Sequence, residues 1–60
     1  MDPNATLAFI NDVAKEDPAD ETLQWAIEDL KEWIEAGGFA PEWNRYPLGT
    51  DLFNQYVEEE

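Results

Sequence analysis

The chain has 60 residues, of which fifteen are Asp or Glu and three are Lys or Arg, and its formal net charge at pH 7 is −12. It contains no histidine, cysteine or serine, so the side chains that most often serve as nucleophiles, general bases and soft-metal ligands are missing. This composition argues against an enzyme and against a bound metal or cofactor, and the charge disfavours direct contact with nucleic acid or an anionic membrane.

An apolar fraction of 43%, with three Trp, three Phe and two Tyr, predicts a folded domain rather than a disordered acidic chain. At this length a single small core is expected. No apolar run is long enough for a transmembrane helix, and residues 1–4 lack the basic and apolar regions of a signal peptide. We therefore expect one domain over residues 1–60, in the cytoplasm.

The first predicted helix spans residues 3–15. Asp2 precedes Pro3, which is the pattern of a capping residue followed by proline at the first helical position. Apolar side chains fall on one side of this helix: Leu7, Phe9, Ile10, Val13 and Ala14. The other side holds Ala8, Asn11, Asp12 and Lys15. The periodicity predicts an amphipathic helix that buries one face.

The second predicted helix spans residues 18–36. Asp17 and Pro18 repeat the start pattern of the first helix, and Gly37-Gly38 is typical of a helix end. Its apolar stripe consists of Leu23, Ala26, Ile27, Leu30, Trp33 and Ile34. Because the link from the first helix is so short, the two helices are expected to form an antiparallel or steeply crossed hairpin.

Residues 39–49 are predicted to be an ordered loop that covers the hairpin. Two prolines interrupt regular structure, yet the segment carries too many large side chains for a flexible linker: Phe39, Trp43, Tyr46 and Leu48. Phe39 is expected to fold back onto the end of the second helix, near Ile34.

A last short helix is predicted over residues 51–58, with Thr50 as its cap and a frayed end at residues 58–60. The predicted fold class is thus all-α: a helical hairpin, an ordered loop rich in proline and aromatic residues, and a C-terminal helix. The predicted core comprises Leu7, Ile10, Val13, Leu23, Ile27, Leu30, Trp33, Ile34, Phe39, Leu52 and Phe53.

Acidic residues gather on the face of the second helix opposite its apolar stripe. The predicted partner-binding carboxylates are Asp20, Glu21, Glu28, Asp29, Glu32 and Glu35. One interpretation is a solvated face that keeps a small protein in solution. The other is a binding surface for a basic partner, in which Glu28, Asp29, Glu32 and Glu35 meet Lys and Arg side chains.

Three aromatic residues complete the set of predicted partner-binding residues. Trp25 falls on the acidic side of its helix, where either the loop or the last helix covers it or it anchors a protein interface. Trp43 and Tyr46 flank Arg45, which is expected either to hold the loop down, by stacking or by pairing with a helix carboxylate, or to take part in recognition.

These features support the hypothesis of a small acidic protein-binding module. In size and charge the chain resembles the small acidic inhibitors made by phages and mobile elements, which implies a DNA-mimic-like occupant of the basic groove of a nucleic-acid-binding protein. An alternative is an assembly module that forms a homo-oligomer or docks through its aromatics. A third is adaptation to high salt, where acidic surfaces are general.

Overall fold

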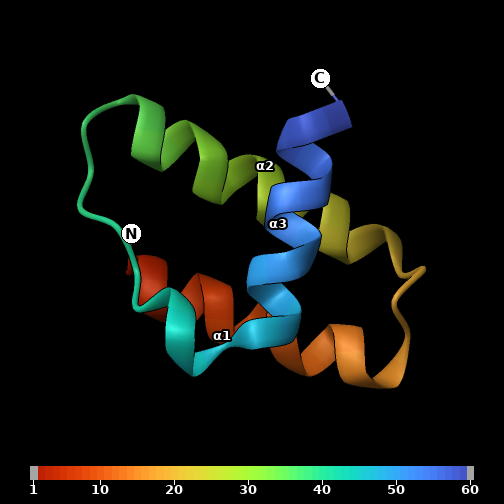
Figure 1. Cartoon of the computed structure of the whole chain (residues 1–60). Helices are drawn as coiled ribbons and strands as arrows, with labels where there is room; N and C mark the ends of the chain where they lie inside the picture. Colours follow the sequence, from red (N-terminus) through yellow and green to blue (C-terminus); the bar gives the residue numbers. More distant parts are fainter. Residues whose placement is uncertain (1, 60) are drawn as a thin grey trace.

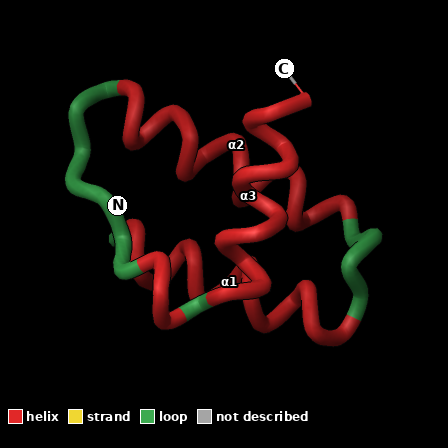
Figure 2. The backbone as a smooth tube through the Cα atoms, in the orientation of Figure 1, coloured by secondary structure: helices red, strands yellow, loops and turns green. Residues whose placement is uncertain are grey.

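Three α-helices and one 3-10 turn make up the computed structural model, which describes residues 2–59 (Figure 1). The helices are α1 (Pro3–Glu16), α2 (Glu21–Glu35) and α3 (Pro47–Glu59), and the turn η1 (Trp43–Arg45) precedes α3. No strand occurs between residues 2 and 59 (Figure 2). The predicted all-α class with three helices is confirmed.

α1 begins as predicted and ends one residue later than predicted. The Asp2 carboxylate accepts hydrogen bonds from the backbone N–H groups of Asn4, at 3.0 Å, and Ala5, at 3.3 Å. These contacts satisfy two of the N–H groups at the helix start that have no partner inside the helix. Pro3 occupies the first turn, where its missing N–H costs nothing.

α2 starts at Glu21, so the prediction that Asp17 caps it and Pro18 opens it is wrong. Asp17 instead ends α1: its N–H donates to Val13 O, and its carboxylate accepts from Ala19 N at 3.0 Å in a local turn. The chain needs these extra residues to reverse direction. Asp20 takes the capping position and accepts from Thr22 N at 2.8 Å.

The glycine pair ends α2 as predicted. Gly37 has φ of +95°, a left-handed conformation that other residues rarely adopt. Its N–H donates to Ile34 O, and the N–H of Gly38 donates to Trp33 O at 2.9 Å. This is the Schellman arrangement, which satisfies carbonyls left over at the helix end.

α3 starts at Pro47, four residues before its predicted start. Thr50 is therefore not the cap; it lies in the first turn, and its hydroxyl donates to Trp43 O at 2.9 Å. The cap comes from another helix, because Asn11 Oδ1 of α1 accepts from Leu48 N at 3.0 Å and Gly49 N at 3.1 Å. The helix includes residues 58 and 59, which were predicted to fray. Glu60 lies outside the described residues.

α1 and α2 run antiparallel, and α3 crosses them (Figure 1). The buried core lies where the three helices meet and consists of Leu7, Ile10, Ala14, Leu23, Ala26, Ile27 and Leu30. Other predicted core residues pack around it and are partly buried: Val13, Trp33, Ile34, Leu52 and Phe53. The radius of gyration is 10.3 Å, which matches the value of about 10 Å expected for a compact domain of this length.

Phe39 and Asn11 depart from their predicted environments, as does Phe9, which was placed on the apolar side of α1 but is 44% exposed. Phe39 is 60% exposed rather than part of the core; its ring packs edge-on against Trp33, with 5.8 Å between centroids. It thus folds back onto the end of α2 but stays at the surface. Asn11, predicted on the polar side of α1, is only 5% exposed because α3 begins directly above it.

Candidate functional site

The outer face of α2 carries the largest concentration of predicted site residues. We use this name for six exposed residues, namely Glu21, Trp25, Glu28, Asp29, Glu32 and Glu35. Trp25 lies among the carboxylates, with Glu21 four residues before it, Asp29 four residues after it and Glu28 three residues after it. At these spacings the side chains are neighbours on a helix surface. Trp25 is 64% exposed, so neither the loop nor α3 covers it.

One edge of the outer face is tied to α3. The Tyr56 hydroxyl donates to Glu28 Oε1 at 2.7 Å. Lys31 pairs with Glu35 at 3.8 Å, and its Nζ lies 5.9 Å from the centre of the Tyr56 ring. Glu32 lines the same hollow, which measures about 240 Å³. Three of the predicted carboxylates therefore share this edge with one lysine and one phenol.

The Tyr56 phenol is affected by these neighbours. Its hydrogen bond to Glu28 raises the pKa of Tyr56 above the ordinary value of 10.0, and desolvation and the negative charges of Glu28 and Glu32 act in the same direction. The phenol therefore stays protonated, and able to donate, over the whole physiological pH range.

The other edge of the outer face borders an open groove between α1 and α2. The groove has a volume of about 410 Å³ and is lined by Ala5, Thr6, Phe9, Thr22, Trp25, Ala26 and Asp29. Phe9 is 44% exposed there. The sequence pattern placed Phe9 on the apolar side of its helix but gave no sign that it would stand opposite Trp25. Asp29 lies in this groove, so the structure divides the predicted acidic face between two edges.

Asp20 has a structural role at the start of α2. Its carboxylate accepts from the backbone N–H of Thr22, and this hydrogen bond is the main cause that lowers the pKa of Asp20 below 3.8, with a further contribution from the Thr22 side chain. The charge faces the positive end of the helix dipole. Asp20 therefore stabilises the start of α2, the helix that carries six of the other predicted site residues.

Trp43, Tyr46 and Arg45 lie on the loop and do not line the groove beside Trp25. Trp43 and Tyr46 are partly buried against the core, and the Trp43 ring lies 5.1 Å from that of Phe53. The structure thus gives both rings packing contacts within the domain and leaves Trp25 as the predicted anchor with the most exposed ring.

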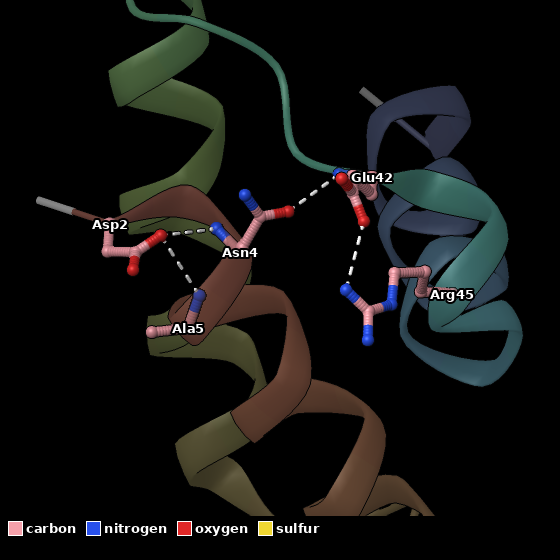
Figure 3. Close-up of polar contacts among 5 residues, drawn as sticks. All are labelled: Asp2, Asn4, Ala5, Glu42 and Arg45. Atoms are coloured by element: carbon pink, nitrogen blue, oxygen red, sulfur yellow. Dashed lines mark hydrogen bonds and ion pairs between the residues drawn. The ribbon is translucent and has the colours of Figure 1, made fainter.

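Arg45 fastens the loop locally (Figure 3). Its guanidinium pairs with the Glu42 carboxylate at 3.2 Å, and the Glu42 N–H donates to Asn4 Oδ1 at 2.7 Å. The start of α1 and the start of η1 are thereby connected. The carboxylate that Arg45 meets belongs to the loop rather than to a helix, and both side chains of this pair are largely exposed.

Comparison with family models, with curated proteins and with solved structures finds no match to this chain. Among residues 2–59, no group of three or more acidic side chains is placed to hold a metal ion. Within the same residues, none of the helices combines the length and the apolar character needed to cross a membrane.

Proposed function

We propose that this protein is a small acidic binding module of the cytoplasm, which docks on a basic protein surface through the outer face of α2. One observation carries the proposal: five exposed carboxylates surround an exposed tryptophan on a single helix face. Carboxylates attract and orient a basic partner, and a tryptophan supplies contact area at the centre of an interface.

The spacing of the charges supports a finer proposal about the partner. From Glu21 to Glu35 the axis of α2 is about 21 Å long, so its five exposed carboxylates are on average about 5 Å apart along the axis. A strand of duplex DNA carries one phosphate per about 3.4 Å of axis. We propose that the partner is a nucleic-acid-binding protein whose phosphate-binding groove accepts α2 in place of nucleic acid, as a phage-derived inhibitor would.

A charge-matched pair of variants tests this function. The first carries Glu28→Gln, Asp29→Asn, Glu32→Gln and Glu35→Gln; the second loses the same charge at exposed positions elsewhere, through Asp12→Asn, Glu16→Gln, Asp51→Asn and Glu58→Gln. Both are used, beside the unaltered protein, to capture partners from host lysate at low and high salt, followed by competition with duplex DNA.

The proposal expects that salt weakens the capture of the partner and that duplex DNA competes with it. Only the first variant should fail to capture the partner. Retention by both variants, or capture that is indifferent to salt, contradicts it, because exposed charges are screened within about 8 Å at physiological ionic strength. Salt-sensitive capture that DNA does not displace leaves a basic partner but removes the nucleic-acid mimicry.

A second candidate function is assembly through aromatic residues, favoured by the exposure of both Phe9 and Trp25 beside one groove. In that case the carboxylates only keep the protein in solution. The native mass of the free protein distinguishes the two functions: an assembly module is an oligomer that dissociates on Trp25→Gln, whereas a charge-driven binding module is a monomer with or without this substitution.

A further inference from the structure

The groove between α1 and α2 has an unusual combination of walls. Phe9 of α1 and Trp25 of α2 are both exposed and line it from opposite helices, and small residues, Ala5 and Ala26, are also part of its lining. Two exposed aromatic rings, in a lining whose other residues include small side chains, offer a ring face against which a flat group can lie.

The negative charge of the groove favours a positively charged occupant. Asp29 is the only charged residue among those that line it. Of the chain's three basic residues, Arg45 pairs with Glu42 on the loop, Lys31 pairs with Glu35, and Lys15 lies in the last turn of α1 outside the lining. The groove therefore offers aromatic faces and a carboxylate, and none of its lining residues is a cation.

We propose that this groove binds an arginine side chain of the basic partner, with the guanidinium against Trp25 or Phe9 and paired with the Asp29 carboxylate. This inference rests on the proposed function and adds the residue type that the site recognises. A guanidinium is planar, stacks on aromatic faces and pairs with a carboxylate through two parallel hydrogen bonds. A lysine ammonium is a strongly hydrated point charge and gains less in such a site.

A second copy of this chain is a poor occupant of the same groove. Two chains would bring together net charges of −12 each, and like charges face to face across an interface cost free energy. The chain's single arginine is already paired at 3.2 Å with Glu42. A partner rich in arginine meets neither obstacle, because its positive charge is opposite to the negative charge of Asp29 and the outer face.

The test uses the intact protein and two blocked peptides, tetra-arginine and tetra-lysine, followed by NMR at low salt. The Trp25 indole and Phe9 ring signals report on the groove. The Trp33 indole N–H, which donates to Phe39 O at 3.0 Å, reports on the fold. We expect tetra-arginine to shift the Trp25 and Phe9 signals, to leave the Trp33 signal in place, and to bind more tightly than tetra-lysine.

Two substitutions that each remove one negative charge give the decisive comparison. Asp29→Asn lies in the groove and Glu35→Gln lies at the far edge of the outer face. We expect Asp29→Asn and Phe9→Leu each to weaken tetra-arginine binding about fivefold, and Glu35→Gln to weaken it less than twofold.

The arginine groove is overturned if Asp29→Asn and Glu35→Gln reduce the affinity for tetra-arginine equally. It is also overturned if the two peptides bind with equal affinity and neither shifts the Trp25 signal. The proposed function survives that result, since the attraction would then be spread over the whole outer face. Absence of binding to either basic peptide at low salt is a different outcome, and it removes the proposed function together with the groove.

Discussion

A single buried amide connects the first and last helices. Asn11 Oδ1 accepts two backbone N–H groups at the start of α3, and as a neutral group it does so without the cost of burying a charge. The sequence placed Asn11 with Asp12 on the polar side of α1. Helical periodicity describes one helix at a time, so it cannot reveal that a third helix will need a cap from the first.

Replacement of this amide should be costly. We expect Asn11→Ala to lower the free energy of unfolding by about 1–3 kcal/mol, because two buried N–H groups lose their acceptor. Urea denaturation followed by circular dichroism measures the change. Asn54→Ala, at an exposed position of α3, is the control and should be neutral or slightly stabilising because alanine favours helices. Equal effects of the two substitutions would show that Asn11 does not act as a cap.

At Gly49, α3 lies directly against α1. A Cβ atom at this position would lie 3.0 Å from both Leu7 Cδ1 and Leu7 O, and 3.2 Å from Asn11 N. The backbone atoms cannot yield without moving the helix. Gly49 was predicted to lie in a loop, and only the packing of the two helices explains why glycine is needed inside α3.

The sign of the Gly49→Ala effect tests this packing. In an unobstructed helix the substitution stabilises by about 1 kcal/mol. Here we expect a loss of about 1–3 kcal/mol because the added methyl group forces α1 and α3 apart. Thermal and urea unfolding of the variant measure it, and a more stable variant would contradict the close approach.

Helix ends were predictable where their partners are local. Asp2 with Pro3 placed the start of α1, and Gly37-Gly38 placed the end of α2, because in both cases the hydrogen bonds form within a few residues. The starts of α2 and α3 were wrong by three and four residues. Asp17 was needed to end α1, and the cap of α3 lies 37 residues away in the sequence.

The contact between α2 and α3 has a pH dependence that can be measured on Tyr56. In the Tyr46→Phe variant Tyr56 is the only phenol, so its ultraviolet absorbance titrates alone. We expect a midpoint above 10.0, which Glu28→Gln shifts downward, because the hydrogen bond to Glu28 raises the pKa of Tyr56.

The linked effect on stability follows from the direction of the shift. A folded pKa above the unfolded one means that the contribution of this bond is fully present below the unfolded pKa and is lost as the pH rises through the folded one. Tyr56→Phe should therefore reduce the fall in stability at alkaline pH. A fall of the same size in this variant would assign the alkaline loss to other groups.

At the scale of the whole molecule, the acidic face was predictable and the groove was not. The exposed carboxylates follow from helical spacing on α2 alone. The groove depends on which sides of α1 and α2 remain open after α3 packs, so the presence of Phe9 and Trp25 in one lining emerges only from the tertiary structure. Helical spacing did set Trp25 apart on the acidic side of its helix, but it left open whether another element covers that ring, and it did not show that Trp43 packs against Phe53.

The net charge should act in opposite directions on folding and on binding. Raising NaCl from about 0.01 M to about 1 M shortens the screening length from about 30 Å to about 3 Å. The free protein should gain on the order of 1 kcal/mol of stability as its own carboxylates repel one another less, including the Glu28–Glu32 pair. Its complex with a basic partner should weaken over the same range.

Urea unfolding at each salt concentration measures the first effect, and the captured partner or tetra-arginine measures the second. The variant neutralised at Glu28, Asp29, Glu32 and Glu35 is the control and should respond less to salt in both. A protein that folds only in molar salt would reverse this conclusion, because its carboxylates would then be an adaptation to the solvent. A protein folded at low salt, whose binding is lost as its stability rises, has a surface arranged for a partner.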